Sequence, residues 1–269
     1  MRTLIIPDVH QRIDRVKNIV KSEKFDLLVS LGDWFDNFHD TPKDAEATAE
    51  YILELYSELK DNFIWLLGNH DVGYVFPLVF GAYRCSGMTL PKMKVISEVF
   101  KGRLDKDKLK LCYITKMHNI PLVMSHAGLA KQLFTHPLEE EVRVDYIEEK
   151  CNQALLDCVQ GKEHPILMAG RSRGGSEDYG GITWQDWFHD FKPVQGISQI
   201  VGHTPFHHPI LTWKPNPIRP SDRLLDAGVV YCINDYEKFN LNLDTHSNHY
   251  AVLDDNTLEI YEYTKKFQT

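Results

Sequence analysis

The sequence has little cysteine, and its five cysteines are not spaced as disulfide or zinc-binding pairs. Their number is odd and no C-x-x-C pair occurs, which disfavours a disulfide framework and a cysteine-ligated structural zinc. Cys151 and Cys158 lie two turns apart in a predicted helix and so share one face. We expect reduced thiols throughout, and therefore a cytoplasmic protein. The five cysteines are Cys85, Cys112, Cys151, Cys158 and Cys232.

Long apolar runs are also missing. No stretch approaches the roughly 20 apolar residues that a membrane helix needs. The first residues carry one basic side chain and a short apolar run, unlike a signal peptide. Repeats, low-complexity tracts and linkers are absent as well, so we expect a single domain over residues 1–269 without a membrane partner. A hydrophobic content of 43% and a charged content of 25% are typical of globular proteins.

Positive charge is in deficit: 30 Lys and Arg stand against 38 Asp and Glu, a net charge of -8. This balance argues against strong non-specific binding of long nucleic acid, although a local basic patch around an anionic substrate remains compatible with it. Residues 92–110 form the densest basic stretch, with seven Lys or Arg against three acids. We predict a solvated surface there rather than a substrate patch.

Apolar runs alternate with helical periodicity in the first part of the chain, which indicates βαβ units. Strands are predicted at residues 3–7, 26–31 and 63–67, and helices at residues 13–20 and 42–60. Residues 72–110 are predicted to be less regular.

The second part has fewer helical signals. It is predicted to contain strands at 110–115 and 120–125 joined by a turn, a helix at 144–160, a loop at 170–179 rich in Gly and Arg, and a strand at 196–201. Short alternating runs over 224–263 suggest a closing antiparallel ribbon.

Polar side chains follow five of the predicted strands. Gly68-Asn69-His70-Asp71 alone would be explained most simply as a capped turn. The same arrangement recurs, however, and the carboxyl ends of parallel strands are where open α/β folds place their ligands. The residues at these ends are Asp8 with His10, Asp33, Asn69 with His70, His126, and His203.

These side chains form a donor set for metal. Asp8 and His10 are two apart on a predicted strand, so they point to one face and can bind the same ion. Three histidines, two carboxylates and one amide oxygen are too many for one ion with open positions. They suit two ions that share a bridging carboxylate.

The blocks resemble those of the calcineurin-like metallophosphoesterases, in the family's order over residues 8–204. They are Asp8-Val9-His10, Gly32-Asp33-x-x-Asp36, Gly68-Asn69-His70-Asp71, Ser125-His126-Ala127-Gly128 and Gly202-His203-Thr204. The resemblance implies an α/β (α+β) fold with two mixed β-sheets packed face to face as a sandwich flanked by helices.

The resemblance also implies roles for individual residues. Asp8 and His10 would bind one metal, Asp33 would bridge both, and Asn69, His126 and His203 would bind the other. A metal-bridging hydroxide would attack phosphorus in line while His70, oriented by Asp36, acts as the general acid. Mn is the expected metal, and Fe, Zn, Co or Ni would also suit the donors.

Two details bear on the branch of the family. Pro205 and Asp36 resemble the phosphoprotein-phosphatase and diadenosine-tetraphosphatase branch, but Asn37 stands where that branch usually carries a phosphate-binding Arg. Arg171 and Arg173, beside Gly174-Gly175, are candidate replacements, with a plain surface loop as the alternative. Asn69 is a further candidate to contact the phosphate.

Arg12 is a third candidate arginine, and residues 179–184 are a candidate segment to close over the site. We expect His207 and His208 to lie off the substrate, and His246 and His249 to be structural or exposed.

Hydrolysis of phosphomonoesters, as by Ser/Thr protein phosphatases, is the leading hypothesis. The alternative enzyme is a hydrolase of nucleotide anhydrides or diesters, such as diadenosine tetraphosphate or a nucleic-acid end. The alternative of another class is a metal-binding interaction module without catalysis. The substrate would accordingly be a phosphorylated small molecule, a nucleotide or a phosphoprotein.

Overall fold

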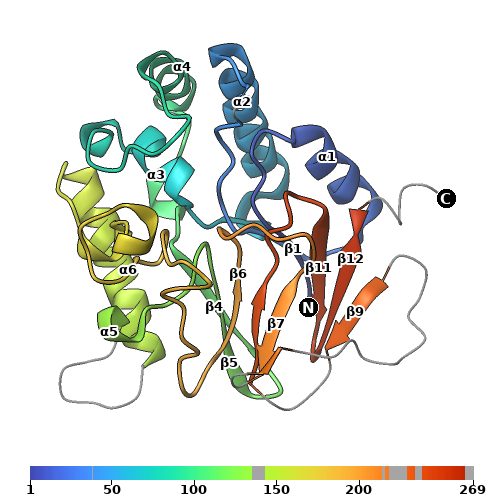
Figure 1. The fold of residues 1–269 in the computed structure, drawn as a ribbon. Helices are drawn as coiled ribbons and strands as arrows, with labels where there is room; N and C mark the ends of the chain where they lie inside the picture. Colours follow the sequence, from blue (N-terminus) through green and yellow to red (C-terminus); the bar gives the residue numbers. More distant parts are fainter. Residues whose placement is uncertain (38, 135–142, 214–215, 218–228, 234–237, 264–269) are drawn as a thin grey trace.

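A computed structural model describes residues 1–37, 39–134, 143–213, 216–217, 229–233 and 238–263. The chain forms two six-stranded sheets that pack face to face, with helices outside them (Figure 1). The first sheet has the order β3-β2-β1-β11-β12-β9 and the second β4-β5-β6-β10-β7-β8. The predicted sandwich of two mixed sheets is therefore confirmed.

The strand bounds explain how the sheets are connected. The first sheet contains β1 (Arg2–Ile6), β2 (Leu27–Ser30), β3 (Phe63–Trp65), β9 (Val229–Ile233), β11 (His249–Asp254) and β12 (Thr257–Glu262). The second contains β4 (Cys112–Met117), β5 (Ile120–Ser125), β6 (Ser198–Val201), β7 (Ile210–Trp213), β8 (Asn216–Pro217) and β10 (Asn240–Asn242). The strands β1, β2 and β3 pair in parallel, and so do β5 and β6.

Strand β1 is apolar on both faces because both are covered. Ile5 points into the core between the sheets, where it joins Leu122 and Ile200 of the second sheet. Its neighbours Leu4 and Ile6 point the other way and join the core under the helices. This is the near-continuous apolar pattern expected of a strand buried on both sides.

The helices cover the outer faces of the sheets. They are α1 (Ile13–Ser22), α2 (Pro42–Leu59), α3 (Asn69–Val75), α4 (Leu90–Phe100), α5 (Lys131–Phe134) and α6 (Val144–Val159). Thr41 begins α2 with a reciprocal capping box to Asp44, and Pro42 fits its first turn. Within the described residues, no helix is long and apolar enough to cross a membrane.

Two predictions about secondary structure and strand pairing were wrong. Residues 72–110 contain a well-formed helix, α4, which Thr89 caps by accepting the Lys92 N–H. The closing ribbon is only partly antiparallel, because β10 leaves it and pairs in parallel with β6 of the second sheet. Residues 224–228 and 234–237 of that ribbon lie outside the described residues.

Candidate active site

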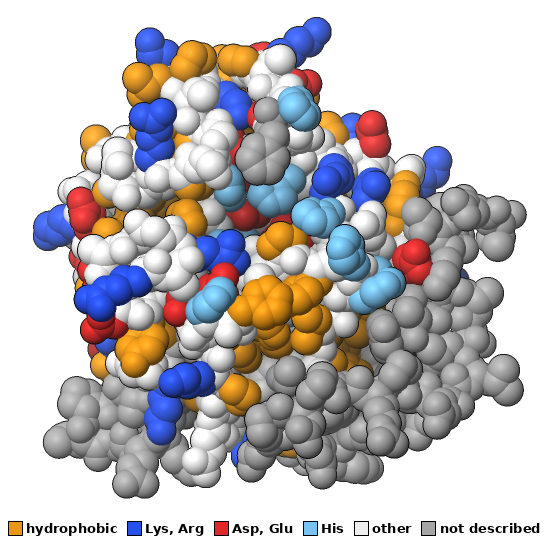
Figure 2. All heavy atoms as spheres, viewed as in Figure 1, with side chains coloured by type: hydrophobic (Ala, Val, Ile, Leu, Met, Phe, Trp, Pro, Cys, Tyr) orange, Lys and Arg blue, Asp and Glu red, His pale blue; other side chains and the backbone are white. Residues whose placement is uncertain are grey.

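The polar residues after the parallel strands meet at one edge of the molecule. Figure 2 shows histidine and acidic side chains gathered in a hollow on this face, with Lys and Arg nearby. Asp33 follows β2, Asn69 opens α3 after β3, and His126 follows β5. His203 follows β6 in the same way. The carboxyl ends of neighbouring parallel strands thus converge, as the sequence pattern predicts.

The turns that carry these residues have unusual backbone conformations. His10, Asp33 and His203 have φ of 43°, 49° and 70°, in the left-handed region that non-glycine residues rarely adopt. Strain of this kind costs about 1–3 kcal/mol per residue and clusters at functional sites. The strand argument for Asp8 and His10 was wrong, because β1 ends at Ile6 and a turn, not a strand, delivers His10.

Asp33 belongs to two groups of potential metal ligands. Asp8, His10 and Asp33 offer one ligand atom each within 4.8 Å of one another, and so do Asp33, His126 and His203. The side chain of Asn69 joins the second group, since its Oδ1 lies 3.0 Å from His126 Nε2. All of these side chains are buried except that of His10, which is partly exposed.

The hydrogen bonds of the histidines leave their second ring nitrogens facing this centre. His126 Nδ1 donates to the Leu31 carbonyl at 2.9 Å, and its Nε2 faces His203 Nδ1 at 3.1 Å and Asp33 at 3.4 Å. His10 Nδ1 donates to the Asp36 carbonyl at 2.8 Å, and its Nε2 faces Asp33. Ring nitrogens and carboxylate oxygens that converge in this way are the donor types that hold a divalent metal, which would replace the protons shared between them, so these residues fit divalent metal.

The electrostatics also favour positive charge at this centre. Burial lowers the pKa of His126, but the carboxylates of Asp33 and Asp8 outweigh burial and raise its pKa to about 9. Burial raises the pKa of Asp33, and the surrounding histidines outweigh it and hold that pKa below its ordinary value. An ionised carboxylate is the form that binds metal.

Two glycines of the motifs are required by close approach. A Cβ at Gly68 would lie 2.1 Å from Asp33 Oδ1, and one at Gly202 would lie 2.1 Å from Asp8 Oδ2. The two carboxylates therefore occupy the space that a side chain would take. Asp71 holds the turns after β2 and β3 together, because its carboxylate accepts the backbone N–H of Asp33 at 2.8 Å and of Gly68 at 2.9 Å.

His70 and Asp36 form a pair beside the potential ligands. His70 Nδ1 lies 3.0 Å from Asp36 Oδ2. Burial lowers the pKa of His70, but the charge of Asp33 and the hydrogen bond with Asp36 outweigh it and raise that pKa well above its ordinary value. Cys85 Sγ lies 3.4 Å from the same ring nitrogen. A protonated imidazole held in this way can deliver a proton to a leaving oxygen.

Lys92 was missed by sequence reasoning, which placed it on a solvated surface. Its side chain is only 5% exposed, and Nζ lies 2.9 Å from Asp36 Oδ1 and 2.6 Å from Asp40 Oδ2. Tyr74 donates to the same Asp36 oxygen at 2.8 Å. No pattern in the sequence distinguishes Lys92 from the other basic residues of 92–110, which are exposed.

The cavity over these groups has a volume of about 390 Å³ and includes residues from eight short stretches of the chain. Asn37 lines it, as do His246 and Asp244, neither of which was predicted to lie there. Asp244-Thr245-His246 repeats the spacing of Asp8-Val9-His10 after another strand, β10, and this was the signal that could have found them.

The candidate arginines are separated by the fold. Arg173 lines the cavity, forms an ion pair with Asp186 at 2.7 Å and donates to Thr204 at 2.9 Å. Arg12 also lines it and donates to the His246 carbonyl at 2.7 Å. Arg171 lies outside, largely exposed and paired with Asp178 at 2.9 Å, so the structure does not bring it to the site.

Trp184 is the member of segment 179–184 that reaches the cavity, where its ring packs edge-on against His203. His207 and His208 are exposed, and neither lines the cavity. His249 is buried and bonded to Thr245, as expected of a structural residue.

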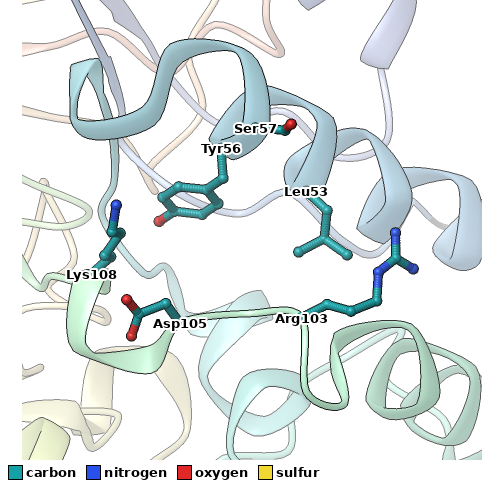
Figure 3. A pocket seen from close by; sticks show the side chains of 6 residues that line it. All are labelled: Leu53, Tyr56, Ser57, Arg103, Asp105 and Lys108. Atoms are coloured by element: carbon teal, nitrogen blue, oxygen red, sulfur yellow. The ribbon is translucent and has the colours of Figure 1, made fainter.

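A separate hollow of about 430 Å³ lies between α2 and residues 103–108 (Figure 3). Its two basic groups are already paired: Arg103 with Glu50 at 2.7 Å and Lys108 with Asp61 at 2.8 Å. It contains none of the residues at the strand ends. We therefore assign the chemistry to the cavity at the strand ends.

Comparison with known proteins agrees with this fold. The profile of the calcineurin-like phosphoesterases matches residues 1–233. A cold-active protein-tyrosine phosphatase of a psychrophilic Shewanella species is 14% identical, with 97% of this chain and 78% of that chain covered and a TM-score of 0.56. A metallophosphoesterase from Sphaerobacter thermophilus is 16% identical over 97% and 88% of the two chains, with a TM-score of 0.49. No curated protein matches.

The fold and the family match define a metal-dependent hydrolase of phosphoester bonds. This protein belongs to the calcineurin-like phosphoesterase family.

Proposed function

We propose that this protein hydrolyses phosphomonoesters with two divalent metal ions. The observation that carries the proposal is the place of Asp33 in both ligand groups, because a shared carboxylate is how a protein holds two ions close together. Asp8, His10 and Asp33 would hold one ion. Asp33, Asn69, His126 and His203 would hold the other.

The two ions, when bound, neutralise phosphoryl oxygens and supply a hydroxide nucleophile at neutral pH. Manganese suits this mixed set of oxygen and nitrogen donors, as do Fe, Zn, Co and Ni.

The chain's own residues would orient the substrate and move the proton. Asp36 accepts from His70 Nδ1 and so turns the opposite ring nitrogen toward the substrate, where it donates to the leaving oxygen. Arg173 lines the cavity and offers a planar pair of donors to a phosphoryl oxygen. The amide nitrogen of Asn69 is the nearest neutral donor for another.

The proposal is tested by measuring Mn²⁺-dependent hydrolysis of p-nitrophenyl phosphate, phosphoserine and phosphotyrosine peptides, nucleotides and bis-p-nitrophenyl phosphate. We expect monoesters to be hydrolysed faster than the diester. Preference for the diester would support the alternative of a diester or anhydride hydrolase. Metal binding without any turnover would support a non-catalytic interaction module.

A cytoplasmic location remains a prediction. It is supported by the free thiols of Cys85, Cys112, Cys151 and Cys158 among the described residues.

A further inference from the structure

A second groove adjoins the candidate active site. Its volume is about 540 Å³, and it shares Ser86, Arg173 and Trp184 with the cavity over the strand ends. The cavity and the groove therefore adjoin, and a ligand that reacts in the cavity can extend into the groove.

The groove also approaches His70. Cys85 lines it, and Cys85 Sγ is 3.4 Å from His70 Nδ1, the ring nitrogen that faces Asp36. In the proposed hydrolysis, the phosphorus gains an oxygen from hydroxide and its bond to the leaving oxygen breaks, and that oxygen takes the proton of His70. The group attached to the leaving oxygen thus lies next to the imidazole.

The charges of the groove are of one sign. It is lined by Arg84 and Arg173 but by no Asp or Glu, in a protein whose net charge is -8. Arg173 is paired with Asp186, whereas Arg84 is exposed and has no ion pair or hydrogen bond within the described part of the chain. Glu177 accepts from Ser176 beside the groove, but its side chain is not part of the lining.

We propose that this groove binds the leaving group, and that the leaving group carries a phosphate of its own, as in a bisphosphate, a nucleotide or an oligophosphate. An unpaired guanidinium in an acid-free groove is matched to a bidentate anion such as phosphate. A neutral leaving group would leave Arg84 without a partner. The inference rests on the proposed hydrolysis, since it places the leaving group beside His70.

The test compares two substrates that differ only in the second phosphate. Phenyl phosphate and hydroquinone bisphosphate are hydrolysed with Mn²⁺ by the parent, by Arg84→Gln and by the control Arg103→Gln, whose arginine lies in the separate hollow (Figure 3). We expect the parent to favour the bisphosphate in kcat/KM by about tenfold or more, the size of a charge-assisted contact. Arg84→Gln should lose most of that preference, and Arg103→Gln should keep it.

The inference is overturned if Arg84→Gln still prefers the bisphosphate, or if the parent shows no such preference. The proposed hydrolysis stands in either case. If Arg84→Gln lowers kcat/KM for a phosphopeptide with acidic residues beside its phosphorylated residue, but not for the bisphosphate, the inference is overturned and the groove binds peptide instead. If neither phosphate ester is hydrolysed, the proposed function fails. In that case, calorimetry with tripolyphosphate and metal-free protein tests separately whether the groove binds phosphate. We expect Arg84→Gln to bind tripolyphosphate with a Kd about tenfold weaker than that of the parent, and an unchanged Kd would contradict the inference.

Discussion

At the scale of single residues, His70 depends on its neighbours for its role. Its Nδ1 is held by Asp36 at 3.0 Å, and the charge of Asp33 favours the protonated ring. A general acid matters most when the leaving group is a poor one, since a good leaving group departs without a proton.

We therefore expect His70→Asn to slow hydrolysis of an alkyl phosphate by about 10²–10⁴-fold and that of p-nitrophenyl phosphate by much less. Asp36→Asn should show the same dependence more weakly, because it only orients the ring. Steady-state kinetics on a series of leaving groups measure this. Equal losses across the series would mean that His70 serves binding instead of proton transfer.

Arg173 and Arg171 provide a matched pair, because both lie in one 3₁₀ turn, Arg171–Arg173, and only Arg173 lines the cavity. We expect Arg173→Ala to lower kcat/KM by about ten- to a hundredfold through loss of a charge-assisted contact to phosphate. Arg171→Ala should stay close to the parent. Kinetics and metal content of both variants test this, and a value for Arg173→Ala within about twofold of the parent would leave phosphate binding to other groups.

At the scale of elements, α4 reaches the site through Lys92. Its ammonium group contacts Asp36, Asp40 and the Gly87 carbonyl, and so ties the helix to two loops at the cavity. A buried charge of this kind is costly to leave unpaired. Removing one partner of a buried ion pair typically costs about 3–5 kcal/mol.

We expect Lys92→Met to lower the free energy of unfolding by about that amount and to slow hydrolysis of poor leaving groups, because Asp36 is no longer fixed against His70. Lys92→Arg should recover part of both. Denaturant unfolding and the leaving-group series measure the two effects. A loss of stability with an unchanged leaving-group dependence would make Lys92 a structural residue only.

The sequence predicts the strand ends well and the helix α4 poorly, for a physical reason. The strands β1, β2 and β3 are apolar runs followed within three residues by Gly or Asp, so their ends and ligands can be recognised from local patterns. Asp244 follows β10 in a local pattern that was not recognised, whereas Lys92 owes its place to a contact between distant segments. Lys92 meets an aspartate 56 positions away, and no local pattern encodes that contact.

Some local patterns were also misinterpreted. Thr89 and Pro91 are ordinary signals for the start of a helix, but they stand between glycines and a basic stretch. His10 reaches its ligand group by a left-handed turn, which spacing along a strand does not describe.

At the scale of the whole molecule, two sheets bring their parallel strand ends to one edge, and each sheet contributes part of the donor set. Asp8, Asp33 and Asn69 come from the first sheet, and His126 and His203 from the second. The metal ions would therefore join the two halves of the sandwich, and Asp33 is the residue through which both ions would be linked.

The central claim is that two ions bound through Asp33 drive phosphoester hydrolysis. The most direct measurement is a titration of metal-free protein with Mn²⁺ in which bound metal and hydrolysis of p-nitrophenyl phosphate are followed together, with Asp33→Asn as the control and circular dichroism to verify its fold. We expect activity to rise from background and to saturate at two ions per chain, and the control to bind metal weakly and remain inactive. Turnover that is unaffected by a chelator, or an Asp33→Asn variant that holds two ions and keeps near-normal turnover, would contradict it.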